Sequence, residues 1–264
     1  MEAHLISAQN QTKGKKKLPA QFEEAVRPDI IKRSVFAIQN NNRQPYGAKP
    51  RAGQRAVGKL SRRRRDYKGS YGHGISRVPR KILSHRGTRF TWVGAVAPGT
   101  VGGRRAHPPK PTKDWSQKVN KKENRKAIRS ALSATVSKEW VTQRGHKTPS
   151  AYPIILESEC EQIKTTKELM KLIESLGLSQ ELSTKRTRVG KGKTRGRRYK
   201  STRGLLIVVS KECMLERAAG KLVETARINT INAEELAPGA IPGRLTLYTE
   251  AAINRLEKEK LFEK

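Results

Sequence analysis

The sequence has few cysteines, no long apolar run and no leader-like start, and each shortage excludes a class of protein. The two cysteines, Cys160 and Cys213, are too few for a disulfide scaffold, and no paired spacing indicates a metal site. The longest uninterrupted apolar run covers residues 205–209, far shorter than a membrane-spanning helix needs. The first residues lack the basic and then apolar order of a secretory signal. We therefore expect a protein of a reducing, cytoplasmic setting with no membrane contact.

Acidic residues are also scarce. The 264 residues include 57 Lys and Arg but only 23 Asp and Glu, which leaves a formal net charge of +34. Like charges in such excess repel one another within a compact domain unless a polyanionic partner neutralises them. The composition therefore predicts binding to a polyanion, and the length allows one or two domains.

The excess charge is concentrated in two segments. Residues 43–113 contain 19 Lys and Arg and a single acid, Asp66, whereas residues 185–203 contain ten Lys and Arg and no acid. Together these segments carry 28 of the 34 net charges, and the remaining sequence is close to an ordinary domain. We therefore expect a globular body, residues 1–42 and 114–264, with a long basic loop at 43–113 and a second basic loop at 185–203.

The first basic segment is rich in glycine and proline, which predicts an extended loop with no regular elements and no core of its own. A disordered, solvated segment is the alternative, but such segments are usually poor in aromatic residues. This one interleaves its basic residues with rings at Tyr46, Tyr67, Tyr71, Phe90 and Trp92. Cations that neutralise phosphates, next to rings that stack on bases, favour RNA binding.

Hydrophobic periodicity predicts an alternation of strands and helices in the body. Expected helices cover residues 27–42, 165–176 and 212–219, one runs from Asn120 as far as Trp140, and a final one begins at Thr249. Expected strands are 152–156, 205–209, 223–228 and 245–248, with a weaker one at 3–7. Capping pairs are expected at Asn120 with Glu123, Thr165 with Glu168, and Asn232 with Glu235. This order predicts an α/β fold, a mostly parallel sheet with flanking helices, in which strand 205–209 is covered on both faces.

Two weak motifs leave an enzyme open as an alternative. Gly192, Lys193 and Thr194 match the end of a phosphate-binding loop, but Thr187 stands where that loop needs its first glycine. The pair Gly72 and Gly74 begins a dinucleotide fingerprint that lacks its third glycine. The alternative reading is thus a nucleotide-dependent nucleic-acid enzyme with Lys193 and Thr194 at the phosphates, or a generic nucleic-acid-binding protein. No cofactor, metal site or catalytic residue is otherwise indicated.

Several stretches resemble one family in the same order along the chain. They are residues 71–74 with 77–80, 102–110, 120–132, 144–146, 190–193 with 196–199, 236–239 and 249–252. The sequence resembles the universal L-four family of large-subunit ribosomal proteins, in its archaeal and eukaryotic form, over nearly the whole chain.

The resemblance implies a structural component of the large ribosomal subunit, not an enzyme. It implies an α/β body outside and a loop at 43–113 that reaches inward between ribosomal RNA helices and lines the nascent-peptide exit tunnel at its tip. It also implies RNA binding early in assembly, contacts with neighbouring ribosomal proteins and the nascent peptide, and no homo-oligomer. A loop of this length folded back on itself reaches at most about 115 Å, and such a segment is expected to order only on its RNA.

Charge and resemblance together mark the residues expected to contact ribosomal RNA. They are Arg51, Arg55, Lys59, Arg62, Arg63, Arg64, Arg65, Lys68, Arg77, Arg80, Lys81, Arg86, Arg89, Trp92, Arg104, Arg105, His107, Lys110, Lys191, Lys193, Arg195, Arg197, Arg198, Tyr199, Lys200 and Arg203. The residues expected at the tunnel tip are Tyr71, Gly72, His73, Gly74 and Arg77.

Overall fold

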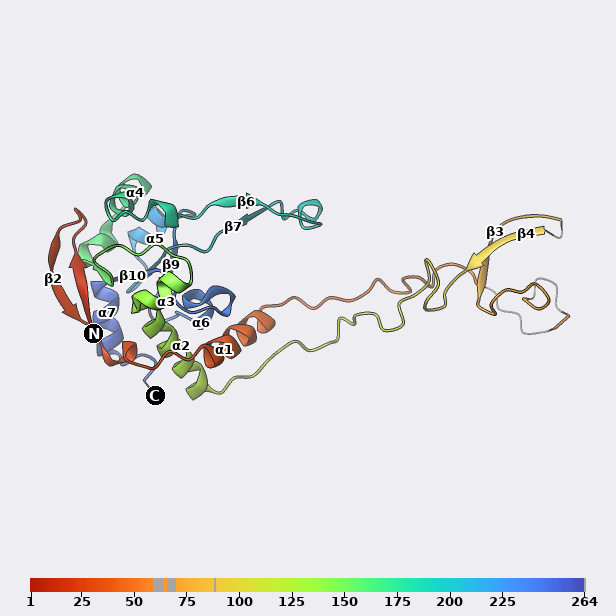
Figure 1. Cartoon of the computed structure of the whole chain (residues 1–264), viewed down its shortest axis with the longest axis horizontal. Coiled ribbons are helices and arrows are strands. Elements are labelled where there is room, and N and C mark those ends of the chain that lie inside the picture. Colours follow the sequence, from red (N-terminus) through yellow and green to blue (C-terminus); the bar gives the residue numbers. More distant parts are fainter. Residues whose placement is uncertain (59–63, 66–69, 88, 264) are drawn as a thin grey trace. The chain divides into compact units, whose positions relative to one another are not determined.

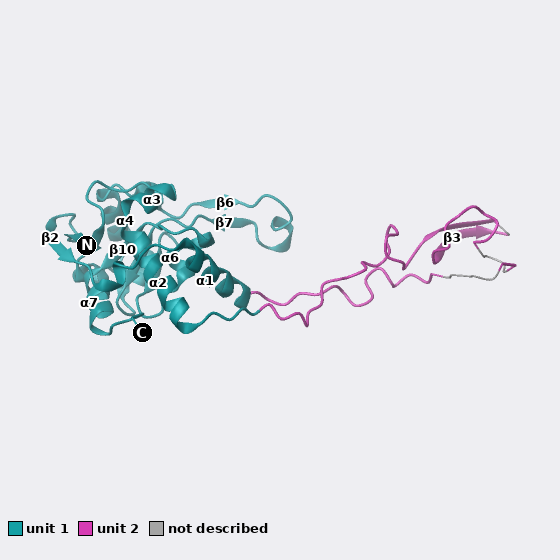
Figure 2. Ribbon diagram, turned by 60° about the horizontal axis from the view of Figure 1, so that its bottom comes forward, with its two compact units in different colours: residues 1–42, 116–264 teal, residues 43–115 magenta. Residues whose placement is uncertain are grey.

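The computed structural model describes residues 1–58, 64–65, 70–87 and 89–263. The chain divides into two compact units (Figure 2). We call residues 1–42 and 116–264 the body, and Arg43–Trp115 the inserted unit. The basic segment 43–113 lies within the inserted unit, and the basic segment 185–203 lies within the body.

The body is built on a six-stranded sheet with the strand order β2-β1-β5-β10-β8-β9 (Figure 1). The strands are β1 Glu2–Ile6, β2 Thr12–Lys17, β5 Ile154–Leu156, β8 Leu206–Val209, β9 Glu224–Arg227 and β10 Thr246–Thr249. Every neighbouring pair is parallel except β1 and β2, which are antiparallel. This confirms the predicted α/β fold with a mostly parallel sheet.

Helices cover both faces of this sheet. They are α1 Pro28–Asn41, α2 Lys121–Val136, α3 Lys138–Gln143, α4 Thr166–Ser175, α5 Met214–Ala219, α6 Ala233–Leu236 and α7 Glu250–Lys258. Strand β8 shows the arrangement, because Leu206 and Val208 belong to one buried cluster and Ile207 and Val209 to another. Helices α1, α2, α6 and α7 contribute to the first cluster, and α4 and α5 to the second. The prediction that this strand is covered on both faces is confirmed.

Local signals locate most helix ends correctly. Thr165 accepts a hydrogen bond from the Glu168 amide and starts α4, and Asn232 with Glu235 forms the predicted capping box of α6. The capping box predicted at Asn120 is wrong, because the Asn120 side chain makes no capping hydrogen bond. The Glu123 carboxylate instead lies 3.1 Å from the Arg33 guanidinium on α1.

The long helix predicted from Asn120 to Trp140 is also wrong, because it is divided in two. Ser137 has an extended backbone (ψ 118°), which ends α2 at Val136 and places Trp140 in α3. The lysine-rich strand β2 was not predicted, since its exposed residues carry no apolar alternation.

The prediction that the inserted unit lacks regular elements is wrong for one hairpin. Strands β3 Arg80–Arg86 and β4 Arg89–Gly94 pair antiparallel. No proline occurs between Pro79 and Pro98, so the backbone N–H groups that a two-stranded ladder needs are present. A second hairpin, β6 Lys185–Thr187 with β7 Tyr199–Ser201, forms in the body's basic segment.

Neither membrane nor metal features emerge from the described ranges. Across them, no helix combines the length and apolar character needed to cross a membrane. The same residues contain no group of three or more His, Cys, Asp or Glu placed to hold a metal ion.

Candidate nucleic-acid interface

The inserted unit has almost no buried residues. Of its residues that the structure describes, only Ser70 and Ala95 are buried, and neither belongs to the two hydrophobic clusters of the body. The same residues include fifteen Lys and Arg but one carboxylate, Asp114. Burial of apolar surface therefore contributes little to ordering this unit, whereas neutralisation of its charge by a polyanion would contribute much.

The two chain segments of the inserted unit approach each other closely at glycines. The Ala48 amide donates to the Pro109 carbonyl at 3.0 Å. Gly53 has a left-handed φ of +75°, and a Cβ atom at this position would lie 2.3 Å from the Gly103 carbonyl oxygen. Any larger residue would push the two segments apart. These glycines therefore allow the segments around Gly53 and Gly103 to run close together, and we call this part of the inserted unit the stem.

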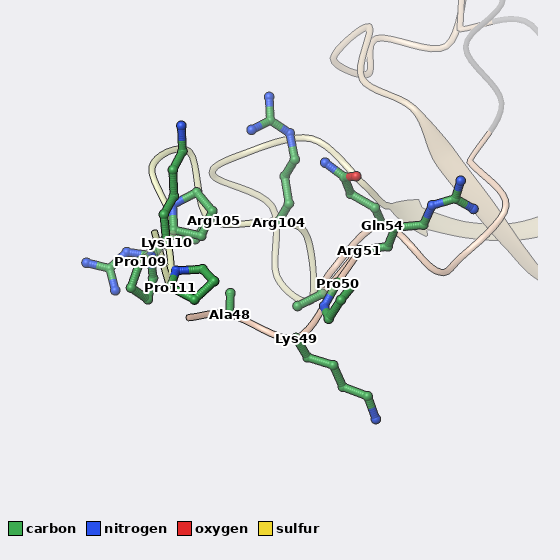
Figure 3. Close-up of a pocket in the computed structure, with 12 residues that line it drawn as sticks. Ala48, Lys49, Pro50, Arg51, Gln54, Arg104, Arg105, Pro109, Lys110 and Pro111 are labelled. Carbon is green, nitrogen blue, oxygen red and sulfur yellow. The ribbon is translucent and has the colours of Figure 1, made fainter. Parts of the chain in front are cut away.

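The charged side chains of this stem point outward. Lys49, Arg51 and Arg104 belong to the lining of a shallow cavity of about 360 Å³, yet their charged ends extend away from it in different directions (Figure 3). Arg105 and Lys110 also line it, and no acidic residue does. Donors that converge would hold a small anion, but donors that diverge fit a polyanion surrounding the stem.

The β3–β4 hairpin carries a row of rings. Phe90 lies 5.8 Å from His85 and 6.3 Å from Trp92, measured between ring centroids. His73 meets Trp92 edge-on at 6.4 Å, and the Arg80 guanidinium lies 6.0 Å from the Trp92 ring. The structure thus brings His73, one of the residues predicted at the tip, next to Trp92, which was predicted to contact RNA.

The turn before this hairpin holds the other predicted tip residues. The Arg77 guanidinium lies over the Tyr71 ring at 4.5 Å. Gly72 and Gly74 have left-handed φ values of +76° and +65°, and no atom of the described residues lies within 4 Å of where their Cβ atoms would be. A half-buried ring next to an exposed guanidinium group is the chemistry that stacks on unpaired bases.

The β6–β7 hairpin presents the body's main concentration of charge. All ten Lys and Arg of residues 185–203 are exposed. Lys191, Lys193, Arg195 and Arg197 lie at its turn, which is closed by the Arg197 amide donating to the Gly192 carbonyl at 3.0 Å. A phosphate-binding loop joins a strand to a helix, whereas this turn joins two antiparallel strands. The geometry therefore gives the nucleotide-enzyme alternative no support.

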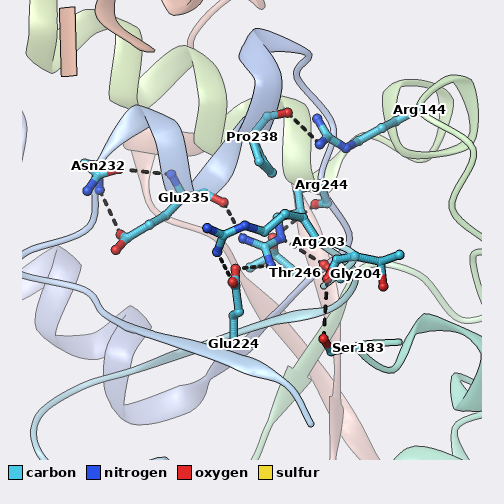
Figure 4. A network of polar contacts seen from close by, with 11 residues as sticks. Arg144, Ser183, Arg203, Gly204, Glu224, Asn232, Glu235, Pro238, Arg244 and Thr246 are labelled. Carbon is cyan, nitrogen blue, oxygen red and sulfur yellow. Dashed lines mark hydrogen bonds and ion pairs between the residues drawn. The ribbon is translucent and has the colours of Figure 1, made fainter. Parts of the chain in front are cut away.

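A buried arginine fixes the root of this hairpin (Figure 4). Arg244 is 1% exposed and donates to the Gly204 carbonyl at 2.8 Å, the Glu235 carbonyl at 2.8 Å and the Glu224 carboxylate at 2.6 Å. Burial, together with the nearby Arg203 charge, lowers the pKa of Arg244 to about 10. Because Gly204 directly follows the basic segment, this network sets where the hairpin leaves the body.

A second polar cluster supports the same root. His146 Nδ1 lies 2.6 Å from the Glu181 carboxylate, which also accepts from the Lys147 amide at 3.0 Å. Burial opposes ionisation of Glu181, but these hydrogen bonds hold its pKa below the ordinary value. Arg144 donates to the Pro238 carbonyl at 2.8 Å. Residues 144–146, which carried part of the resemblance, therefore have structural roles here.

Comparison with known proteins decides the family. The family model described as the ribosomal protein L4/L1 family matches residues 16–259. The chain belongs to this family. The large ribosomal subunit protein uL4 of Nanoarchaeum equitans is 44% identical over 99% of this chain and 100% of its own length. The protein uL4 of Archaeoglobus fulgidus is 40% identical over 97% of this chain and 98% of its own length. That of Methanopyrus kandleri is 39% identical over the full length of both chains. The resemblance inferred from the sequence is confirmed.

For this family member, the predicted RNA contacts fall in both units. Lys59, Arg62, Arg63 and Lys68 lie outside the residues that the structure describes. Sequence reasoning missed Trp115, which has Arg43 and Lys113 over its ring. The sequence did contain a signal for Trp115, because this residue continues the alternation of aromatic and basic residues. It was left out because the basic segment was bounded at Lys113, its last basic residue.

Proposed function

We propose that this chain is a structural, RNA-binding component of the large ribosomal subunit, acting in the cytoplasm and without catalytic activity. The inserted unit lies among ribosomal RNA helices, and its cations contact backbone phosphates. One observation carries this proposal: a member of a ribosomal protein family has fifteen described cations in a unit with one described carboxylate and two buried residues. Such a unit acquires its stability from the surrounding RNA.

The rings of the β3–β4 hairpin and its preceding turn contribute a second kind of contact. Tyr71, His73 and Trp92 carry their rings on short exposed turns and strands, close to Arg77 and Arg80. We assign Tyr71, Gly72, His73, Gly74 and Arg77 to the wall of the nascent-peptide exit tunnel. The two glycines add no side chain of their own to this turn, which suits a narrow passage.

The proposed position of the inserted unit among RNA helices also implies when the protein joins the subunit. A two-stranded segment that lies between RNA helices has to be in place before those helices pack against each other. We therefore assign the chain to an early step of large-subunit assembly, with later contacts to neighbouring ribosomal proteins. The β6–β7 hairpin supplies an additional RNA contact from the body, since its ten cations face solvent.

Binding of the full-length protein to transcribed large-subunit ribosomal RNA, measured at several salt concentrations, tests the proposal. The affinity should fall steeply with salt, because each phosphate contact adds about 0.9 to the slope of log affinity against log salt. Deleting residues 59–86 removes ten cations and should reduce this slope by several units. The circular dichroism of the body should survive the deletion. Salt-insensitive binding, or a body unfolded by the deletion, would contradict the proposal.

A further inference from the structure

The base of the inserted unit contains a preformed cluster around one tryptophan. The Tyr46 ring lies nearly parallel to Trp115, with centroids 5.9 Å apart and an interplanar angle of 19°. The Arg43 guanidinium carbon lies 4.5 Å from the Trp115 ring centroid, and the Lys113 ammonium nitrogen 4.1 Å. Residues from the start and the end of the unit therefore meet on one indole.

Among the residues that the structure describes, the indole N–H of Trp115 has no acceptor. Its nitrogen is buried and has no hydrogen-bond partner in the described part of the chain. An indole N–H can only donate, and a buried donor without an acceptor costs free energy. The side chains that lie against the ring, Arg43 and Lys113, are themselves exposed. An acceptor from a partner can therefore reach this N–H when it draws one of these cations aside.

Space for such a partner lies next to the cluster. Tyr46 and Lys113 also line a cavity of about 650 Å³, together with Arg105, His107 and Lys110. Neither Asp114 nor any other carboxylate of the described residues is part of its lining. The cavity thus presents hydrogen-bond donors and positive charge over an extended area.

These features select the chemistry of the ligand. Stacking of a base on Trp115 is disfavoured, because Tyr46 and the two cations already contact its ring. What the cluster still offers is an N–H donor and two positive charges, which together fit a negatively charged oxygen. Because the neighbouring cavity continues the positive charge, the anion should repeat along a chain, as the phosphates of a nucleic acid do.

We propose that Trp115, Arg43 and Lys113 form a binding site for one backbone phosphate of RNA at the base of the inserted unit. The indole N–H donates to a phosphate oxygen, and the guanidinium and ammonium groups neutralise its charge. This inference rests on the proposed function and extends it to three residues outside the set predicted from the sequence.

The test separates the indole N–H from the ring. Trp115→Phe keeps an aromatic face for the cations on a smaller ring and removes the donor. In the binding assay with transcribed large-subunit ribosomal RNA, it should weaken binding about tenfold and leave the salt slope unchanged. Lys113→Gln should reduce the slope by about 0.9. The matched controls, Trp140→Phe in α3 and Lys164→Gln at an exposed site of the body, should change neither quantity.

A double variant and a competing anion complete the experiment. If both groups hold one phosphate, Trp115→Phe with Lys113→Gln should weaken binding by less than the product of the single effects. Replacing chloride by inorganic phosphate at equal ionic strength should preserve the difference between the wild type and Trp115→Phe.

Three results would overturn the site. They are wild-type affinity of Trp115→Phe, multiplicative single effects, and loss of the difference in inorganic phosphate, which would indicate a free-anion site. If the wild type itself binds without salt dependence, the proposed function fails instead.

Discussion

The body and the inserted unit differ in what can order them. In the body, Phe22 and Leu132 are completely buried within a cluster that spans the sheet and its helices. In the inserted unit, Val57 is 86% exposed and Val101 is 99% exposed. The hydrophobic effect therefore accounts for the fold of the body, whereas the inserted unit is held by hydrogen bonds and ring contacts and, as we propose, by a partner of opposite charge.

The two regions also use arginine differently. Arg244 is buried in the body, where two carbonyls and a carboxylate accept from it. Arg104 in the inserted unit points away from the stem (Figure 3). The guanidinium of Arg244 is used to stabilise the fold of the body, whereas that of Arg104 is accessible to a ligand. Net charge alone does not make this distinction, since it depends on the carboxylates nearby.

The largest effect on stability should come from the core of the body. Phe22→Ala removes a completely buried ring that meets Tyr248 edge-on at 5.2 Å. It should lower the free energy of unfolding by about 4 kcal/mol in urea titrations, because it leaves a cavity. Val101→Ala in the inserted unit is the control and should stay within about 0.5 kcal/mol of the wild type. Equal losses would abolish the contrast between the two regions.

A somewhat smaller loss is expected from the buried arginine. Arg244→Met fills similar space but leaves the Gly204 and Glu235 carbonyls and the Glu224 carboxylate without this donor. The free energy of unfolding should fall by about 3 kcal/mol. The control is Arg203→Gln, which removes an exposed partner of the same Glu224 and should cost less than about 1 kcal/mol. Similar values for the two variants would show that burial of Arg244 contributes nothing.

Sequence patterns predicted the body far better than the inserted unit, for a physical reason. Periodic apolar residues and caps such as Thr165 report on contacts that the chain makes with itself. The lysine-rich strand β2 was not predicted because it is an exposed edge strand. The β3–β4 hairpin was not predicted because the prolines on either side of it indicated a loop. The cluster at Trp115 joins residues about seventy positions apart, which local patterns do not register. Composition predicted a polyanion-binding segment, which stays a prediction, but it did not predict how the rings of that segment meet.

Two glycines with the same backbone angle sharpen the comparison within the inserted unit. Gly53 and Gly102 both have φ +75°, but only at Gly53 would a Cβ meet backbone, 2.3 Å from the Gly103 oxygen. Substitution by alanine adds left-handed strain of about 1 kcal/mol at either position. Gly53→Ala should therefore weaken RNA binding more than Gly102→Ala, while neither changes the unfolding of the body. Equal binding by the two variants would mean that the close approach of the stem is dispensable.

The smallest expected effect is a pH dependence confined to the body. Arg227 donates to both carboxylate oxygens of Glu216, at 2.7 and 2.8 Å, and these hydrogen bonds lower the pKa of Glu216. A carboxyl whose pKa is lower in the folded state stabilises the fold fully above its ordinary pKa, and that stability is lost as the pH falls through the lowered value. Because Arg227 is exposed and solvent screens its charge, the contribution should be small.

Glu216→Gln isolates this contribution. The variant should be less stable than the wild type at neutral pH, and the difference should shrink once the pH falls below about 4.5, the ordinary pKa of a glutamate. Glu257→Gln, at an exposed position of α7, is the control and should follow the wild type throughout. Urea titrations at several pH values measure both. A difference that persists in acid would mean that Glu216 acts through packing and that its ion pair with Arg227 contributes nothing measurable.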